Sequence, residues 1–103
     1  MKMKTYISGP ISGVKEGNRV AFKRAELGLW SLGVEPVNPH EIHVGAEDFT
    51  WRGFMRRDLI ALLNCNAIFM LPGWWWSKGS RVEYRLAKGL GVSVYGFWKG
   101  GWR

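Results

Sequence analysis

A glutamate, an aspartate and a tyrosine are the side chains in this sequence best suited to nucleophilic or acid–base chemistry. Glu83 lies in the first turn of a predicted helix, where backbone N–H groups and the helix dipole stabilise a carboxylate, so we expect it to stay ionised. Asp58 shares an otherwise apolar helix face with Phe54 and Leu62, and burial there would raise its pKa and suit it to donate a proton. Two carboxyl groups in opposed environments can divide acid and base roles. Tyr6, on a predicted strand, could add a hydroxyl group.

These three residues also have purely structural interpretations. Ser80 and Glu83 have the spacing of a capping box, in which the serine caps the helix and the glutamate reaches back to its backbone, and spacing alone favours this role. Asp58 follows two arginines, as an acid in a solvated ion-pair face often does. Tyr6 equally fits an inward-facing position in the core. The residue types alone therefore leave both interpretations open.

The other reactive residue types do not form a catalytic or metal-binding pattern. His40 and His43 have no nearby cysteine or pair of acids, so we interpret them as loop or surface histidines rather than zinc ligands. Cys65 has no activating neighbour and is expected to be a packed small residue. The spacing from Gly9 to Gly13 is one residue too short for a P-loop. We therefore expect neither a metal nor another cofactor.

Four short strands and three helices are predicted to alternate along the chain. Hydrophobic patterns and turn residues place strands at residues 4–8, 34–37, 67–71 and 92–97. Helices are predicted from an Asn18 cap to a terminating Gly33, from a Thr50 cap to residue 63, and over roughly residues 80–88. Residues 40–49 show no clear periodicity, and residues 98–103 form a short, basic, glycine-rich tail.

This alternation predicts a single α/β domain over residues 1–103 with a Rossmann-like or flavodoxin-like fold. Four to five short strands would form a parallel sheet with right-handed crossovers and helices on both faces. Ligands bind to such sheets beyond the carboxyl ends of the strands. In this chain those ends lead into residues 8–13 and residues 72–80. Both loops should share one crevice.

Composition limits the compartments and partners that suit the protein. The chain has 103 residues, 47% of them hydrophobic, which is enough for one compact core. A single cysteine and the absence of a signal-peptide pattern fit a cytoplasmic protein. Residues 59–77 carry no charge but are divided by turn residues, so we expect no membrane span. A net charge of +7 favours anionic partners such as nucleotides or nucleic acid.

Several stretches of the sequence resemble the nucleoside 2-deoxyribosyltransferase superfamily, including its nucleotide N-glycosidase branch. They are residues 6–13, with the sequence Tyr-Ile-Ser-Gly-Pro-Ile-Ser-Gly, residues 57–59 followed by Ala-Ile at 67–68, and the spacing Ser77-x-Gly79-x-x-x-Glu83 before a helix. The last spacing is the most specific. The resemblance spans most of the chain, and it is closer still to a family of small phage-type domains of unknown function that is expected to share the fold.

The resemblance implies a glycosyl-transfer mechanism and a role for each matching residue. Glu83 matches the nucleophile, which attacks the anomeric carbon of a deoxyribosyl group and forms a covalent glycosyl-enzyme that water or a second base resolves with retention. Asp58 matches an acid associated with recognition or protonation of the base, and Tyr6 matches a tyrosine that lies against the sugar and the nucleophile. The substrate-binding positions that it implies are Ser8, Gly9, Pro10, Ile11 and Ser12 in the first loop, and Ser77, Gly79 and Arg81 in the second.

The residue at position 77 bears on the substrate. Free-nucleoside transferases commonly carry an acid there against the sugar 5′-hydroxyl, whereas the nucleotide-hydrolysing branch has a serine, as this chain does. The groups that could receive a 5′-phosphate at the helix N-terminus are Ser77, the Gly79 N–H group, Lys78 and Arg81. Ser12 argues against this, because that branch has an arginine there. We favour a nucleoside 5′-monophosphate over a free nucleoside.

Two further interpretations stay open. The positive charge, the tryptophans and the basic tail also suit a non-catalytic module that binds nucleotides or nucleic acid. Alternatively, the chain could be an oligomeric accessory protein in which Glu83 only caps its helix. Trp74, Trp75 and Trp76 could stack a base or cover a dimer interface, and we favour packing or association. A homodimer or larger homo-oligomer is expected, since members of the superfamily are commonly oligomeric and the domain is small.

Overall fold

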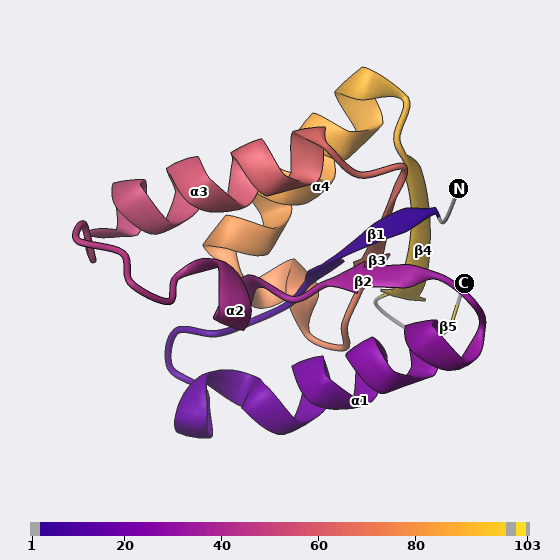
Figure 1. The fold of residues 1–103 in the computed structure, drawn as a ribbon, viewed down its shortest axis with the longest axis horizontal. Coiled ribbons are helices and arrows are strands. Elements are labelled where there is room, and N and C mark those ends of the chain that lie inside the picture. The colour runs from indigo at the N-terminus through magenta and orange to yellow at the C-terminus, as the bar shows by residue number, and fades with distance from the viewer. Residues whose placement is uncertain (1–2, 99–100, 103) are drawn as a thin grey trace.

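A computed structural model describes residues 3–98 and 101–102 of the chain. In these residues, strands and helices alternate along most of the chain, except that α2 is followed by α3 and β4 by β5 (Figure 1). The strands are β1 (Lys4–Ser8), β2 (Glu35–Val37), β3 (Ala67–Met70), β4 (Ser93–Trp98) and β5 (Gly101–Trp102). The helices are α1 (Arg19–Ser31), α2 (Pro39–Ile42), α3 (Trp51–Leu63) and α4 (Lys78–Leu90), with 3-10 turns at Lys15–Asn18 and Trp74–Trp76.

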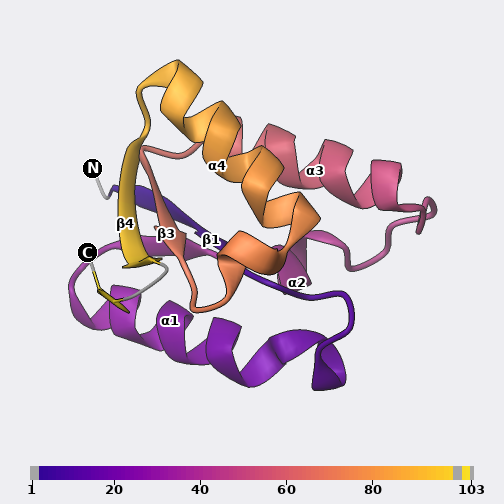
Figure 2. The same ribbon diagram turned by 180° about the vertical axis from the view of Figure 1, so that it is seen from behind.

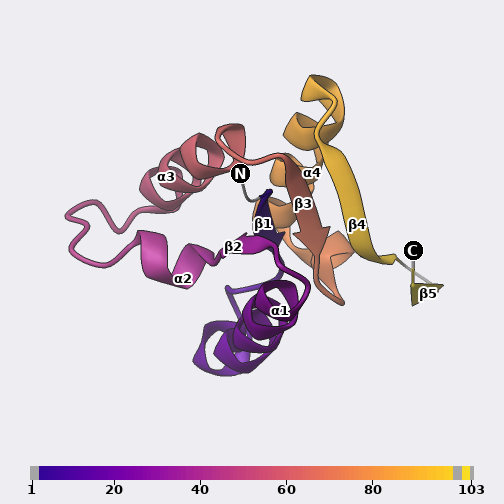
Figure 3. The ribbon, with the colours of Figure 1, turned by 45° about the vertical axis from the view of Figure 1, so that its right-hand side comes forward.

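The strands form one sheet in the order β2-β1-β3-β4-β5, in which the first four are parallel. Helix α1 covers one face, whereas α3 and α4 cover the other (Figures 1 and 3). Seen from behind, α4 crosses the sheet beside β3 and β4 (Figure 2). The predicted parallel α/β architecture is therefore confirmed. The fifth strand lies in the tail, pairs antiparallel with β4, and carries no strand pattern in the sequence.

Alternation along β1 decides which side chains reach which layer. Ile7 points towards α1 and packs with Phe22 and Leu71 in one hydrophobic cluster. Tyr6 belongs to the cluster on the opposite face, which includes Leu62 of α3. Because side chains two apart on a strand share a face, Ser8 lies on the same side as Tyr6. Two hydroxyl groups of β1 are thus directed towards α4.

The start of α4 differs from the prediction, and the difference changes the role of Glu83. The helix begins at Lys78, with Ser77 as its N-cap residue, and the Ser77 hydroxyl oxygen accepts a hydrogen bond of 3.2 Å from the Ser80 backbone N–H. The predicted capping box between Ser80 and Glu83 is therefore wrong. Glu83 lies beyond the first turn, so the free N–H groups of that turn are not adjacent to its carboxylate.

The other predicted helix boundaries are largely confirmed. The Thr50 hydroxyl oxygen accepts a 3.1 Å hydrogen bond from the Gly53 N–H and caps α3. Gly33 follows the end of α1 with a φ of 78°, as a terminating glycine does. Asn18 occupies the N-cap position of α1, but its side chain makes no capping hydrogen bond and its φ is 64°. None of the described helices has the length and apolar character that crossing a membrane requires.

The segment without periodicity contains α2, which the sequence analysis missed. A helix of four residues is too short to show a 3.6-residue repeat. The side chain of Asn38 caps it by accepting a 3.0 Å hydrogen bond from the His40 N–H, and Pro39 occupies its first turn. Helix α2 contacts both β1 and α3.

The three consecutive tryptophans have different environments. Trp74 is buried. Its ring packs against Tyr84 and, edge-on, against Trp98. Its Nε1 donates a 2.6 Å hydrogen bond to the Phe97 carbonyl oxygen. Trp75 packs against the same cluster, whereas Trp76 is 75% exposed. Packing thus accounts for Trp74. Cys65 is also packed, as expected, and burial raises the pKa of its thiol to about 11.

Candidate active site

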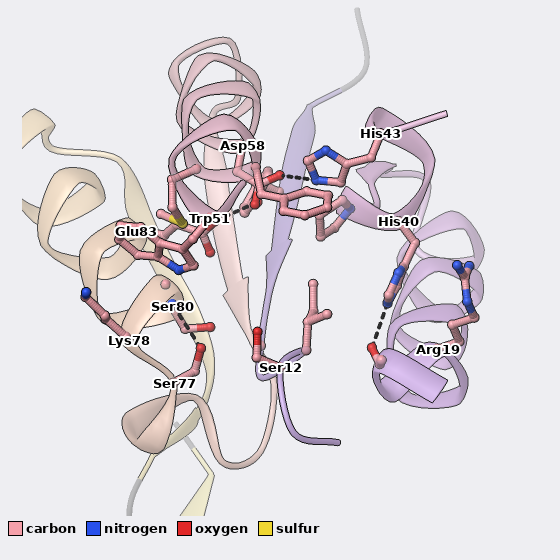
Figure 4. A pocket seen from close by; sticks show the side chains of 18 of the residues that line it. Ser12, Arg19, His40, His43, Trp51, Asp58, Ser77, Lys78, Ser80 and Glu83 are labelled. Atoms are coloured by element: carbon pink, nitrogen blue, oxygen red, sulfur yellow. Dashed lines mark hydrogen bonds and ion pairs between the residues drawn. The ribbon is translucent and has the colours of Figure 1, made fainter. Parts of the chain in front are cut away.

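The two loops predicted to share a crevice meet at a cavity of about 1100 Å³ at the carboxyl edge of the sheet (Figure 4). We call it the carboxyl-edge cavity. The predicted site residues that line it are Tyr6, Gly9, Ile11, Ser12, Asp58, Ser77, Gly79 and Glu83. Three predicted residues are not among its lining residues. Ser8 is buried, Pro10 is half-buried, and the Arg81 side chain is exposed on α4.

Close approach of the backbone shapes the two loops. A Cβ atom added to Gly9 would lie 2.8 Å from the Cβ of Leu71, so the first loop passes directly over the end of β3. A Cβ atom added to Gly79 would lie 3.1 Å from the sulfur of Met55 on α3. Glycine at these positions lets the first loop and the first turn of α4 reach the cavity without displacing their neighbours.

The carboxylate of Glu83 is held by β1. The Tyr6 hydroxyl donates a 2.8 Å hydrogen bond to Glu83 Oε2, and the Ser8 hydroxyl donates a 2.6 Å hydrogen bond to Oε1. The Glu83 residue is only 4% exposed, yet it lines the carboxyl-edge cavity. Its helix places it there because Ser80, Glu83 and Ala87 form the buried face of α4. This glutamate therefore faces the cavity instead of capping its helix.

Burial changes the protonation of both acids. Burial, followed by the charge of the neighbouring Asp58, raises the pKa of Glu83 to about 8, although the hydrogen bonds from Ser8 and Tyr6 act in the opposite direction. Burial also raises the pKa of Asp58 to about 7. The expectation that Glu83 simply stays ionised is wrong, because it lies outside the first turn and deep in the protein. Near neutral pH the two carboxyl groups together retain a proton.

The hydroxyl group of Tyr6 acts as a donor in this site. Burial, followed by the charges of Glu83 and Asp58, holds its pKa well above the ordinary value of a tyrosine. The hydroxyl group thus keeps its proton and donates it to Glu83 in a hydrogen bond. A hydroxyl donor at this place favours the ionised form of the glutamate.

His43 is a site residue that the sequence analysis assigned to a loop or surface. Its Nε2 lies 2.9 Å from Asp58 Oδ1, and only 13% of its side chain is exposed. On its other side, Nδ1 is 2.8 Å from Arg57 Nε. The ring also packs edge-on against Phe54, with 4.6 Å between ring centroids. No local pattern marks His43, because its partners come from a helix that begins eight residues later.

Further aromatic and cationic side chains complete the cavity wall. Trp51, Phe54 and Trp76 contribute rings, and Arg19 and Lys78 contribute positive charge. The Lys78 ammonium lies 4.4 Å from the centroid of the Trp51 ring. His40 lines the cavity as well, with Nε2 2.8 Å from the carbonyl oxygen of Gly17 (Figure 4). Of these residues, the sequence pointed to Lys78 as a possible phosphate contact and to Trp76 as a possible base-stacking residue.

Two buried oxygen atoms in the cavity wall have no hydrogen bond among the described residues. They are Asp58 Oδ1, whose 2.9 Å contact with His43 is short but poorly aligned, and Ser80 Oγ. Ser80 is only 2% exposed. Buried polar atoms normally have a partner. A polar group of a bound molecule would satisfy Ser80 Oγ. No group of three or more potential metal ligands occurs in the described part of the chain.

Comparison with known proteins places this arrangement among related folds. A sequence model described as "Domain of unknown function (DUF4406)" matches residues 3–95. Among solved structures, a 2-deoxyribosyltransferase from Bacillus psychrosaccharolyticus has a TM-score of 0.73 at 22% identity, with 91% of this chain and 71% of that one covered. A 2-deoxyribosyltransferase from Leishmania mexicana has a TM-score of 0.71 at 16% identity, covering 92% of this chain and 63% of the other. No curated protein sequence matches the chain.

These similarities confirm the flavodoxin-like fold that the resemblance implied. This chain spans less than two thirds of the Leishmania protein, so that protein is substantially longer. At such low identity, the similarity to these two structures shows the fold alone. The chemistry of the cavity depends on the residues that line it and not on the fold.

Proposed function

The chain belongs to the DUF4406 family, and we propose that it cleaves the N-glycosidic bond of a nucleoside 5′-monophosphate or a nucleoside. The proposed enzyme is an N-glycosidase or a deoxyribosyltransferase that works through a covalent glycosyl-enzyme. Glu83 is the nucleophile, Asp58 the proton donor, and Tyr6 the residue that holds the nucleophile in place. Two solved structures of the same fold are 2-deoxyribosyltransferases, which supports this assignment as an analogy between folds.

The observation that carries the proposal is the position of Glu83. A glutamate that served only its own helix would direct its carboxylate towards the helix backbone. Here the carboxylate faces a cavity and accepts hydrogen bonds from Tyr6 and Ser8. The second acid, Asp58, lines the same cavity and has a raised pKa. Of the two acids Glu83 has the higher pKa, about 8 against about 7 for Asp58, so the free pair holds its last proton mainly on Glu83. Glycosidic cleavage needs that proton on Asp58 and the negative charge on Glu83, which the hydrogen bonds from Ser8 and Tyr6 favour.

In the proposed reaction, the singly protonated pair of acids is the active form. Asp58 donates its proton to a ring nitrogen of the base as the glycosidic C–N bond breaks, and the Glu83 carboxylate forms a bond to the anomeric carbon. The free base leaves with the proton. Water or a second base then attacks the same carbon and releases Glu83, while Asp58 accepts the proton of the attacking group. Two displacements at one carbon give net retention.

The first turn of α4 is the proposed place for the sugar 5′ substituent. Ser77 and Gly79 line the cavity there, and Lys78 and Arg19 supply positive charge within it. Arg81 is exposed and not among the lining residues, so we assign no phosphate contact to its side chain here. A phosphate group suits this end better than an uncharged hydroxyl group does, because it gains from the Lys78 ammonium group, whereas Arg19 lies across the cavity (Figure 4). We therefore keep the nucleoside 5′-monophosphate as the preferred substrate.

A second candidate function is binding without catalysis. The net charge of +7 and the exposed Trp76 on the cavity rim would suit a module that binds nucleotides or single-stranded nucleic acid. Steeply salt-dependent binding of single strands with no release of base would support this function instead.

The experiment that separates the two is an assay for free base. The protein is incubated with deoxyribonucleosides and their 5′-monophosphates, with and without an acceptor base, and the products are separated by chromatography. We expect base release by the wild type and its loss in Glu83→Ala. Glu47→Gln is the control, because Glu47 is exposed and is not among the residues that line the cavity. Equal base release by wild type and Glu83→Ala, or none by either, contradicts the proposal for these substrates.

A further inference from the structure

We infer that His43, held in a single tautomer by Arg57, is a positioning residue that orients the carboxyl group of Asp58 for proton transfer. The inference rests on the proposed role of Asp58 as proton donor. It concerns a segment that neither the family resemblance nor the sequence pattern assigned to the site. His43 can donate a hydrogen bond to Asp58 only if Nε2, the ring nitrogen that faces the carboxyl group, carries the proton.

The contact with Arg57 decides the tautomer. A guanidinium group can only donate hydrogen bonds, so the 2.8 Å contact from Arg57 Nε requires His43 Nδ1 to accept. The proton of the neutral ring is therefore on Nε2, the atom that lies 2.9 Å from Asp58 Oδ1. Arg57 is itself fixed, because its Nη2 donates a 2.7 Å hydrogen bond to the Asp48 carbonyl oxygen. Its guanidinium carbon also lies 5.2 Å from the centroid of the Phe54 ring.

The imidazole stays neutral in this setting. Burial lowers the pKa of His43, and the charges of Arg57 and His40 lower it further. A neutral ring with Nδ1 occupied has one N–H group to offer, and that group faces Asp58. His43 thus serves as a fixed hydrogen-bond donor and is not itself the source of the transferred proton.

A donor at Oδ1 assigns different tasks to the two oxygens of Asp58. Oδ1 faces His43, so the acidic proton of the neutral carboxyl group is carried by Oδ2. The contact is poorly aligned without a substrate, as hydrogen bonds of unliganded sites often are, and should tighten when the proton leaves and Oδ1 gains charge. The N–H group favours the carboxylate and opposes the effect of burial. Tyr6 and Glu83 act on the same carboxyl from β1 and α4, and Arg57 acts on it from α3.

The test measures the tautomer and the titration of Asp58 directly. Nitrogen-15 NMR of the full chain should show His43 with Nε2 protonated and Nδ1 unprotonated. Carbon-13 NMR of the aspartate carboxyl groups should show the midpoint of Asp58 rising by about one pH unit or more in His43→Phe. Phenylalanine keeps the ring against Phe54 but removes the donor. His43→Gln should restore most of the wild-type midpoint, because its amide nitrogen can occupy the place of Nε2.

A residue with only a structural role would give a different result. If Nδ1 carries the proton in the wild type, or if His43→Phe leaves the Asp58 midpoint unchanged, the inference is wrong. If His43→Gln shifts the midpoint as much as His43→Phe does, packing and not the donor controls Asp58, and the inference is again wrong. These titrations do not require turnover. Failure of the proposed function, seen as no base release by the wild type, is therefore distinguishable from failure of the inference.

Kinetics provide the second readout where base is released. The limb of the pH profile of kcat/KM that follows Asp58 should move with the midpoint measured by NMR in His43→Phe. Arg57→Met should raise the midpoint of His43, since the guanidinium charge lowers it in the wild type. An unchanged His43 midpoint in Arg57→Met would show that Arg57 does not control the ring, contrary to the inference.

Discussion

Glu83 shows how the surroundings of one side chain set its chemistry. Its carboxylate is removed from water and from the free N–H groups of its own helix, and it is left with two hydroxyl donors from β1. Burial favours the neutral acid, and the donors favour the anion. The balance between them leaves a carboxyl group that titrates far above the range of an exposed glutamate. Both the free energy of unfolding and the activity should therefore depend on pH through this residue.

Replacing the glutamate by its neutral isostere should change how stability depends on pH. The pKa of Glu83 is about 8 in the folded protein and ordinary in the unfolded chain, so the folded state binds the proton more tightly between these values. The stability that this group contributes is complete below pH 4.5 and is lost progressively as the pH rises to about 8. Glu83→Gln should therefore be increasingly favoured over the wild type as the pH rises from 5 to 8. Urea unfolding of both proteins at several pH values measures this difference.

Comparing the two proteins is necessary because other groups titrate in the same range. The pKa values of His40 and His43 are lowered in the folded state, so these residues add stability as the pH rises through their unfolded value. They are present in both proteins and largely cancel in the difference. A difference in unfolding free energy that stays constant from pH 5 to 8 would contradict the raised pKa of Glu83.

Removing the hydroxyl group of Tyr6 should reduce activity while preserving the fold. Tyr6→Phe keeps the buried ring but leaves Glu83 Oε2 without the donor that favours its ionised form. We expect kcat/KM for base release to fall about 10-fold or more. Tyr95→Phe is the matched control, because Tyr95 is exposed on β4 and away from the cavity. Equal activity in the two variants would show that the Tyr6 hydroxyl has no part in the reaction.

At the scale of elements, the sequence was informative where an element was long or strictly alternating. The helices that became α1 and α3 and the strands that became β1 and β3 follow from periodicity and turn residues. The boundary of α4 was missed because Ser77 and Ser80 are both acceptable caps, and only the packing of Glu83 against β1 decides between them. Helix α2 was missed because four residues are too few to show a helical period. The position of His43 depends on contacts with α3, which no local pattern records.

The true cap of α4 can be tested by a pair of serine substitutions. Ser77→Ala removes the acceptor for the Ser80 N–H group and should lower the free energy of unfolding by about 1 kcal/mol. Ser80→Ala removes a buried hydroxyl oxygen that has no hydrogen bond and should leave stability unchanged or higher. Urea unfolding measures both. A larger loss in Ser80→Ala than in Ser77→Ala would restore the capping box that the sequence alone favoured.

At the scale of the whole molecule, the net positive charge and the cations that line the cavity both attract anionic ligands. The chain carries a net charge of +7, and two of its cations, Arg19 and Lys78, line the carboxyl-edge cavity. The sequence predicted a preference for anions and a place for Lys78 beside the ligand, but it also pointed to Arg81, which is not a lining residue, and it did not point to Arg19. The arrangement in space depends on α1 and α4 meeting the same cavity from different sides of the sheet.

Salt should therefore distinguish two classes of ligand. The affinity for a deoxyribonucleoside 5′-monophosphate is expected to fall several-fold between 50 mM and 500 mM salt, because the ions screen its attraction to the cations. The affinity for the matching nucleoside should change little. Isothermal titration calorimetry with the catalytically impaired Glu83→Gln variant measures both. The same salt dependence for both ligands would show that no phosphate is recognised.

The two margins of the sheet restrict how copies of the protein can join. At one margin, β2 has three residues with a proline at its centre, and at the other, β5 has two residues that pair backwards onto β4. The proline removes a backbone donor at the β2 margin, whereas β5 pairs only with Phe97 and Trp98, so no described strand lies beside the outer edge of β4 over residues 93–96. If the expected homodimer forms by continuing a sheet from one subunit into the next, the β4 margin is the one that can take part, and the β2 margin is not.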